Sequence, residues 1–333
     1  MDTWTPPEVE RQRLVRYQDL RPCTAAFIDA KTPGSHLKEN FTIIGPGVAE
    51  NPRQHVHIRE KHGFNIGGAR QPAHIVNSQH SHETAEVFIV ISGQWAMRAG
   101  VTAHDAEVVL GPGDLISLPT RMFRGFENVS PDGDTGFLFS ILGGDDPGRV
   151  TWAPNGRHHP EAYGLVLLDD GRLIDTTTGE QVPDEARVVR PLTSEQVDLF
   201  DRVTSEELER YVVRASAMVH QQPLIAPDAA PIASLRWPNG FSVEAVRGFL
   251  PAVADHRARV LLAIAGSVEV RWEDGSVRLS TGDTLTIPRN LECGVETLGD
   301  HGLALLVTGD EEHPVPSPLP ASMYLVPASA ADE

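Results

Sequence analysis

The chain has 333 residues and a formal net charge of -18 at pH 7, and this length predicts two domains of ordinary size. The acidic charge excludes a general role in binding nucleic acid or an anionic membrane, because both would be repelled. Only Cys23 and Cys293 are present, outside any paired motif, so neither a disulfide scaffold nor a zinc knuckle is indicated. The sequence shows no signal-peptide pattern and no long apolar run, and we expect a cytoplasmic protein.

Glycine, proline and short β-branched runs are spread through the chain and predict a mainly β protein. Helices are expected in two places, Pro7–Tyr17 and Thr193–Val219. The second region carries two pairs at capping-box spacing, Thr193 with Gln196 and Thr204 with Glu207. We expect two short helices there.

An internal repeat is the strongest sign of organisation. The first copy comprises residues 91–93, VVLGPGDLISLP at 108–119 and GFLFSILGGDDP at 136–147. The second comprises residues 264–266, VRLSTGDTLTIP at 277–288 and GLALLVTGDEEHP at 302–314. Order and spacing are kept, so one supersecondary plan is predicted to occur twice.

The repeat divides the chain into three parts. Residues 1–150 form the first predicted domain, with an N-terminal extension, and residues 226–333 form the second. Residues 151–225 connect them and hold a hairpin signal at Asp170-Gly171, followed by the two expected helices.

Residues 80–93 read HSHETAEVFIVISG, which places His80, His82, Glu86 and Gly93 at a specific spacing. This segment resembles the complete first motif of the cupin superfamily. Residues 113–128, GDLISLPTRMFRGFEN, resemble the second motif, except that Arg124 stands where a final metal-binding histidine is usual.

The resemblance covers both halves of the chain and implies an all-β bicupin. Its expected fold is two cupin barrels of the double-stranded β-helix, or jelly-roll, type with a few short helices. Bicupins of this length with one intact barrel resemble gentisate and quercetin dioxygenase-like proteins. The gentisate type uses three histidines without the glutamate, and the quercetin type keeps the glutamate and the third histidine, so this chain matches neither ligand set.

The residues themselves lead to a compatible prediction. Alternate residues of a strand share a face, so His80, His82 and Glu86 are expected to point into one interior. Val87 and Ile89 fill the opposite face, which predicts a strand buried on both sides. Two imidazoles and one carboxylate form the facial-triad ligand set, which leaves open positions on a divalent metal.

Arg124 has three interpretations. A guanidinium that points into the barrel could bind a substrate oxyanion beside the metal, which would make Arg124 a catalytic residue. A guanidinium that neutralises Glu86 would lower the affinity for metal. A salt bridge on the surface is the third possibility.

Other side chains could complete the cavity. The four histidines before the first motif are candidates for a replacement ligand, although surface or hydrogen-bonded histidines are the ordinary alternative. These are His55, His57, His62 and His74, of which His74 is nearest in sequence. The turn residues Trp152-Ala153-Pro154 and His158-His159 could fold over the mouth of the barrel or form a surface loop.

The second repeat lacks a ligand set. Alignment of the two copies puts Val253, Asp255 and Arg259 at the positions of the first motif's ligands, and Cys293 at the position of Arg124. We therefore expect a structural C-terminal barrel.

Three functions remain. The first is a mononuclear iron dioxygenase, an oxidoreductase acting on a small anionic substrate, aromatic acids included, with the metal held by His80, His82 and Glu86. The second is a non-redox isomerase, lyase or decarboxylase with Glu86 or a histidine as general base. The third is a non-catalytic small-molecule-binding bicupin. The expected cofactor is Fe(II), with Mn, Ni, Zn or no metal as alternatives.

Apolar outer faces at Val87–Ile91 and Leu261–Ala265 also predict a homodimer, because another subunit commonly covers such faces.

Overall fold

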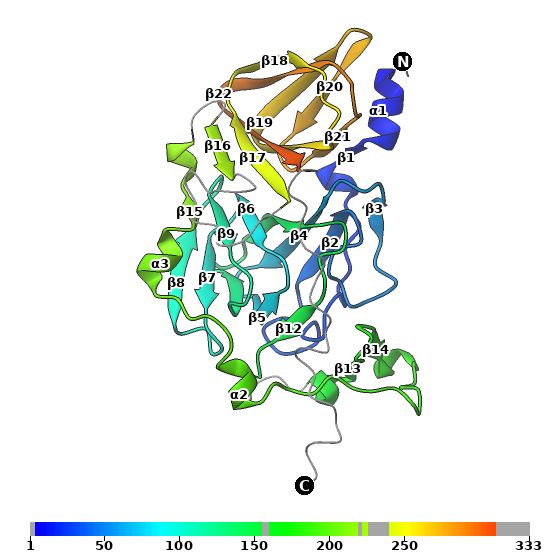
Figure 1. Ribbon diagram of the computed structural model, residues 1–333, viewed down its shortest axis with the longest axis vertical. Coiled ribbons are helices and arrows are strands. Elements are labelled where there is room, and N and C mark those ends of the chain that lie inside the picture. Colours follow the sequence, from blue (N-terminus) through cyan, green and yellow to red (C-terminus); the bar gives the residue numbers. More distant parts are fainter. Residues whose placement is uncertain (1–3, 155–159, 219–221, 226–239, 311–333) are drawn as a thin grey trace.

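The computed structural model describes residues 4–154, 160–218, 222–225 and 240–310. These residues form two jelly-roll domains that lie one above the other in Figure 1, with few and short helices, as predicted. The helices are α1 (Pro6–Gln12), α2 (Ser194–Val197) and α3 (Ser205–Glu209), with 3-10 turns η1 (Tyr17–Asp19), η2 (Pro160–Tyr163), η3 (Thr176–Thr178) and η4 (Ala215–Ala217). Both predicted capping boxes are present at the starts of α2 and α3.

The N-terminal jelly roll consists of two facing sheets that do not close into a barrel. Its seven-stranded sheet has the order β15-β9-β6-β11-β4-β2-β3, and its five-stranded sheet has the order β12-β5-β10-β7-β8. The first sheet comprises β2 (Glu39–Ile44), β3 (Val56–Ile58), β4 (Phe64–Pro72), β6 (Glu86–Ser92), β9 (Leu115–Leu118), β11 (Thr135–Gly143) and β15 (Val212–Val213). The second comprises β5 (Val76–His82), β7 (Trp95–Ala99), β8 (Ala106–Leu110), β10 (Arg124–Asn128) and β12 (Val150–Trp152).

The C-terminal jelly roll is one eight-stranded sheet whose two long strands, β19 and β22, take part in both of its layers. The strand order along the sheet is β1-β21-β19-β22-β17-β16; in addition, β18 pairs with β22 and β20 pairs with β19. The strands are β1 (Leu14–Val15), β16 (Gln222–Ile225), β17 (Phe241–Val246), β18 (Phe249–Val253), β19 (Arg259–Trp272), β20 (Gly275–Ser280), β21 (Thr284–Ile287) and β22 (Cys293–Gly309).

Strand register supports the alignment of the two repeats. Glu86 pairs with Leu118 in the first jelly roll, and Arg259 pairs with Ile287 in the second. Arg124 likewise pairs with His80, and Cys293 with Val253. The same plan is therefore built twice with different side chains at the equivalent positions.

The two domains pack face to face through an apolar layer. Val87 and Ile89, on the outer face of the seven-stranded sheet, share one buried cluster with Val260, Leu262 and Ile264 of β19. The predicted burial of β6 on both sides is thus confirmed. The outer faces that suggested a homodimer are covered by the other domain of the same chain. They therefore no longer argue for a second subunit, and the homodimer stays a prediction.

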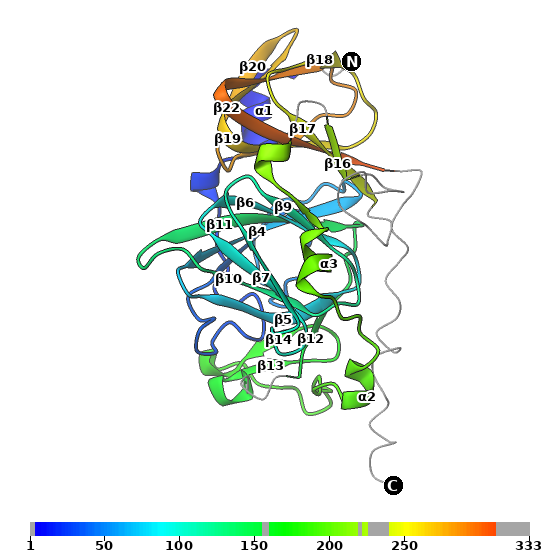
Figure 2. The same cartoon turned by 90° about the vertical axis from the view of Figure 1, so that its left-hand side faces the viewer.

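Two short arms are exchanged between the domains. The N-terminal arm, α1 and β1, lies on the C-terminal sheet, where β1 pairs with β21. The arm that precedes the second repeat, α3 and β15, lies on the N-terminal sheet, where β15 pairs with β9. Figures 1 and 2 show α1 beside the upper domain and α3 beside the lower one.

An aspartate anchors each arm in the same way. Asp283 accepts hydrogen bonds from Arg16 Nη1 and the Tyr17 amide, each at 2.9 Å. Asp114 accepts the equivalent bonds from Arg214 Nη1 and the Ala215 amide, also at 2.9 Å. The internal repeat therefore includes the two arms as well as the jelly rolls. The alignment of the two repeat copies in the sequence did not detect the arms.

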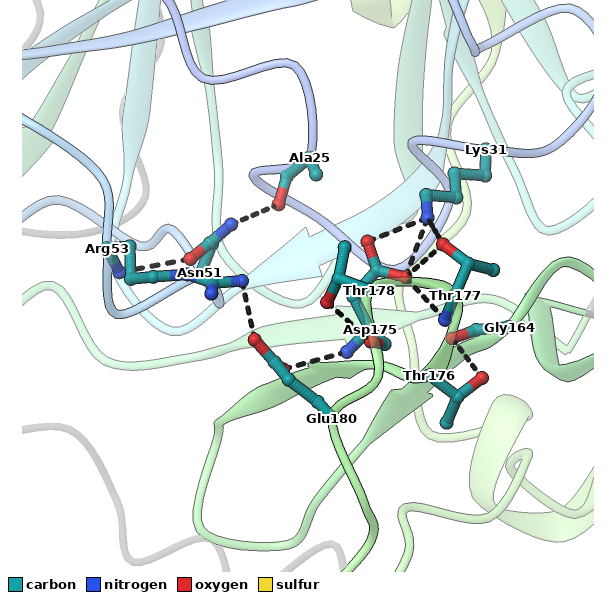
Figure 3. A network of polar contacts seen from close by, with 10 residues as sticks. All are labelled: Ala25, Lys31, Asn51, Arg53, Gly164, Asp175, Thr176, Thr177, Thr178 and Glu180. Carbon is teal, nitrogen blue, oxygen red and sulfur yellow. Dashed lines mark hydrogen bonds and ion pairs between the residues drawn. The ribbon is translucent and has the colours of Figure 1, made fainter.

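The expected hairpin forms β13 (Leu165–Leu167) and β14 (Leu173–Asp175), with Asp170-Gly171 in its turn. It lies beneath the N-terminal jelly roll (Figure 1). Figure 3 shows how polar contacts fasten this region to the segments on either side of β2. Before β2, Lys31 Nζ lies 2.6 Å from Asp175 Oδ1 at the end of β14; between β2 and β3, Arg53 Nη2 lies 2.6 Å from Glu180 Oε1. The hairpin region therefore supports both segments from outside.

Among the described residues, no helix has the length and apolar character needed to span a membrane.

We predict that Asp283→Ala lowers the free energy of unfolding by about 3 kcal/mol. The substitution removes the carboxylate that accepts hydrogen bonds from Arg16 and from two partly buried backbone amides. Urea denaturation measures the change. Glu10→Ala, which removes an exposed partner of the same arginine, should cost less than about 1 kcal/mol. Equal effects of the two substitutions would show that Asp283 does not anchor the arm.

Candidate functional site

The predicted site residues come from three strands of the N-terminal jelly roll. His80 and His82 lie on β5 and Arg124 begins β10, both in the five-stranded sheet, whereas Glu86 begins β6 in the seven-stranded sheet. The sequence prediction treated the two histidines and the glutamate as members of one strand. In the structure a turn at residues 83–85 separates β5 from β6, and the three side chains meet across the lumen.

The three potential ligands lie close together and are shielded from solvent. One donor atom from each of His80, His82 and Glu86 lies within 4.8 Å of the other two. Their exposed fractions are 4%, 5% and 4%. Among the described residues this is the only cluster of three or more such side chains that could hold a metal ion.

Arg124 is 1% exposed, so the surface salt bridge is wrong. Its Nε and Nη2 atoms both lie 3.3 Å from Glu86 Oε2, and its Nη1 donates to the Met122 carbonyl at 3.1 Å. The guanidinium therefore pairs with Glu86, the second of the three interpretations. Binding of a substrate anion by Arg124 stays a prediction, since its hydrogen bonds go to protein atoms.

Burial and the Arg124 charge determine the protonation of this cluster. Burial, reinforced by Arg124, lowers the pKa of His80 to about 3 and the pKa of His82 well below its usual value. Burial also raises the pKa of Glu86 to about 7, although Arg124 acts in the opposite direction. Both imidazoles are consequently neutral at physiological pH, which is the form that binds metals.

Hydrogen bonds fix the orientation of His80. Its Nδ1 lies 2.7 Å from the Ser78 carbonyl, which requires the proton on Nδ1 and leaves the Nε2 lone pair available. Behind it, the buried Lys38 pairs with Asp29 and donates to Asn77 Oδ1 at 3.0 Å. Asp29 also accepts a hydrogen bond from the Ser78 amide at 3.1 Å. The Lys38–Asp29 ion pair therefore fixes the backbone at Ser78, whose carbonyl orients the His80 ring.

The donor set fits a divalent metal. His82 Nδ1 is buried and has no hydrogen-bond partner within the described residues, and such an orphaned nitrogen is costly without a ligand. Arg124 and His82 both approach Oε2 of Glu86, which leaves Oε1 for another partner. The positive charge of Arg124 cancels that of the carboxylate, so the set attracts a cation less strongly than three unpaired ligands would.

A cavity of about 70 Å³ adjoins the three potential ligands. Its walls are largely aromatic and aliphatic, with Phe88, Phe126 and Trp152 near the histidines, and Arg124 is not among its lining residues. A space of this size holds only a few water molecules. It is therefore suited to a small molecule.

Of the additional side chains considered from sequence, only Trp152 lines this cavity; its ring centre lies 5.5 Å from that of His80. His74 is on the surface, 2.7 Å from Asp132, so it does not replace the missing ligand. His55, His57 and His62 are likewise absent from the cavity wall. His158 and His159 lie outside the described residues.

Sequence reasoning missed Glu50 and the polar wall around Asn40. Glu50 accepts hydrogen bonds from the Trp152 indole and the Ile28 amide, each at 2.7 Å, and so ties the loop before β3 to β12. No motif marks these residues, because the segment before β4 reaches the site through non-local contacts, the sheet pairing of β2 with β4 and the bond of Glu50 with Trp152.

The equivalent position of the C-terminal jelly roll holds no ligand set. Arg259 replaces the glutamate, is 5% exposed, and donates to the Val253 and Leu291 carbonyls. Cys293 is buried beside it, and burial raises the pKa of this thiol. These side chains cannot supply the metal ligands found in the first domain.

Part of the N-terminal jelly roll matches a known protein family. Residues 69–140, from within β4 to within β11, contain all four site residues and match the family model of the cupin domain. No curated protein matches the sequence.

Three solved structures are similar at low identity. They are the formate complex of Lactobacillus farciminis oxalate decarboxylase (TM-score 0.49, 10% identity, 91% of this chain and 87% of that chain), a mutant of Bacillus subtilis oxalate decarboxylase (0.49, 10%, 94% and 79%) and Momordica charantia 7S globulin (0.49, 12%, 90% and 84%). Because these similarities are weak, the jelly-roll assignment rests on the strand order, and the resemblance to gentisate and quercetin dioxygenases stays a prediction.

The raised pKa of the buried Glu50 predicts how the stability of the protein depends on pH. Burial raises its pKa to about 8, against the hydrogen bonds of Trp152 and Ile28, which lower it. In the unfolded chain the carboxyl ionises near 4.5, so unfolding releases a proton between about pH 4.5 and 8. Native stability should therefore fall as the pH rises through this window, by at most about 1.4 kcal/mol per pH unit.

Glu50→Gln should remove this part of the slope in urea denaturation measured across the window. The exposed Glu185→Gln is the matched control and should leave the slope unchanged. An identical slope in the wild type and Glu50→Gln would contradict the buried, protonated state of Glu50.

Proposed function

We propose that the cupin domain of this chain is a metal-dependent oxidoreductase, a mononuclear iron dioxygenase that acts on a small anionic substrate. The observation that carries the proposal is the convergence of two neutral imidazoles and one carboxylate, His80, His82 and Glu86, within 4.8 Å in a buried lumen. This ligand set is typical of non-haem Fe(II) oxygenases because it leaves coordination positions open.

Each residue has a distinct role in the proposal. His80 and His82 provide lone pairs, and the Ser78 carbonyl keeps His80 in the required tautomer. Glu86 provides the carboxylate, and Arg124 positions it through Oε2. When bound, the iron would supply Lewis acidity and a position for dioxygen.

The substrate class follows from charge and space. The histidines are neutral, and Glu86, whose pKa is raised to about 7, cancels part or all of the Arg124 charge near neutral pH. The cluster is therefore neutral or weakly positive, and a bound dication would make it attract an anion. The cavity of about 70 Å³ favours a compact acid of a few non-hydrogen atoms. Apolar side chains such as Phe88, Phe126 and Trp152 surround the potential ligands, so this part of the cavity favours the apolar part of a substrate.

We predict near-stoichiometric iron in the purified wild-type protein and its loss in His82→Ala, because the substitution removes one of three ligands. Elemental analysis measures the metal, and oxygen uptake with small carboxylic acids tests the reaction. His74→Ala, which removes an exposed histidine, is the control and should retain the iron.

Other results would lead to other functions. A redox-inert metal without oxygen uptake would favour a non-redox isomerase, lyase or decarboxylase. Absence of metal in both the wild type and the variants would contradict the proposal and favour a small-molecule-binding bicupin.

We further predict that Arg124→His binds divalent metal at least about tenfold more tightly than the wild type, because a cation is replaced by a neutral ligand. Competition with a metal chelator measures the affinity. Arg124→Met removes the charge without adding a ligand and separates the two effects. Unchanged affinity in both variants would contradict an opposing role for Arg124, whereas tighter binding with lost turnover would assign Arg124 a part in the reaction.

A further inference from the structure

The cavity has a second polar region away from the histidines and Glu86. Asn40 and Thr42 lie on the same face of β2, and Gln54 lies in the loop before β3; all three line the cavity. In the seven-stranded sheet, β11 and β4 separate β2 from β6. The two polar regions are therefore at different parts of one continuous space.

This region contains buried polar atoms without partners. Asn40 is 7% exposed, and its Oδ1 makes no hydrogen bond within the described residues. Gln54 donates through Nε2 to Thr42 Oγ1, but its buried Oε1 also has no partner there. An unsatisfied buried amide oxygen is costly, and two of them on one cavity wall point to a polar ligand.

The amides are held firmly in place. The backbone of Asn40 makes two hydrogen bonds with Cys23, at 2.8 and 3.1 Å. Gln54 is held by its backbone bond to the Asn51 carbonyl at 3.1 Å and by its side-chain bond to Thr42. The Gln54 amide cannot turn away without breaking its bond to Thr42, so it is preorganised. At Asn40 the hydrogen bonds fix the backbone from which the side chain extends.

The middle of the cavity is kept open by small residues of β4. Asn40 pairs with Ala69 and Thr42 pairs with Gly67. A Cβ at Gly67 would lie 3.0 Å from both Ser140 Oγ and the Phe41 carbonyl. A larger residue there would reduce the space between the amides and the potential metal ligands.

We propose that Asn40 and Gln54 form a subsite for a hydroxyl group, so that the substrate is a small hydroxy acid. This inference rests on the proposed function, in which the carboxylate end lies near the metal. A hydroxyl group both donates and accepts, and it therefore satisfies an amide oxygen while remaining neutral. A second carboxylate is disfavoured, since amide oxygens would repel it.

The test compares matched acids that differ by one hydroxyl: glycolate with acetate, lactate and 3-hydroxypropionate with propionate, and 4-hydroxybutyrate with butyrate. Calorimetric titration of the metal-loaded full-length protein measures each dissociation constant. We expect at least one hydroxy acid to bind about tenfold or more tightly than its partner.

Two variants of similar shape test the subsite directly, Asn40→Leu and Gln54→Met. Each should remove most of the preference for the hydroxyl while retaining the affinity for the unsubstituted acid. Because Asn40→Leu removes an unsatisfied polar atom, its melting temperature without ligand should stay the same or rise. Gln54→Met also removes the bond to Thr42, so Asn40→Leu is the variant for this measurement. Gln94→Met, which changes an exposed amide outside the cavity, should keep the preference.

The outcomes separate the two proposals. If both members of every pair bind equally and the variants change nothing, the amides are satisfied by water and the hydroxyl subsite is overturned, while the metal site stands. If metal is bound but no acid binds, the hydroxyl subsite and the anionic substrate are both overturned. Loss of metal binding itself, measured by elemental analysis, would contradict the proposed function.

Discussion

The apolar layer between the two jelly rolls is the contact on which the site depends. Val87 and Ile89 face the C-terminal domain, where they share a cluster with Leu262 and Ile264. Because side chains alternate along a strand, burying these residues directs Glu86 and Phe88 into the lumen. Each buried aliphatic side chain contributes about 1.5–3 kcal/mol, so a one-residue shift of β6 would lose the layer and turn Glu86 outward. The C-terminal domain thus fixes the register of the functional strand without supplying a ligand.

Within the lumen, the Glu86–Arg124 pair sets the electrostatics. A guanidinium that is 1% exposed requires a nearby acceptor, and Glu86 provides it through Oε2. The same contact positions the carboxylate and cancels its charge. An incoming dication therefore meets a neutral cluster with Oε1 and two imidazoles available. The charge of Arg124 opposes the approach of a cation, and under the proposed function a metal-loaded site would carry a net positive charge.

The walls of the site come from segments that are remote in sequence. Asn40 belongs to β2, Trp152 to β12, and Glu50 joins the loop before β3 to Trp152. The hairpin β13–β14 then supports this loop, because the Leu173 amide of β14 donates to the Glu50 carbonyl at 3.0 Å. Arg53 of the same loop pairs with Glu180, which follows the hairpin (Figure 3). The connecting region therefore contributes to the cavity by holding in place a loop that lines it. The size and polarity of the cavity depend on this loop as well as on the motif strands.

The sequence by itself determined the β class, the repeated plan and both capping boxes, because these follow from local spacing and strand periodicity. It also marked His80, His82 and Glu86 as a cluster through their motif spacing, although the turn that brings Glu86 from the facing sheet was seen only in the structure. Only the tertiary structure decided how Arg124 is used, since burial and the approach of β10 to β6 are non-local. It also decided the exchange of the two arms, which depends on which sheet edge each short strand meets. The polar wall at Asn40 and Gln54 carried no recognisable motif, because unsatisfied hydrogen-bonding groups become evident only when the surrounding chain has folded around them.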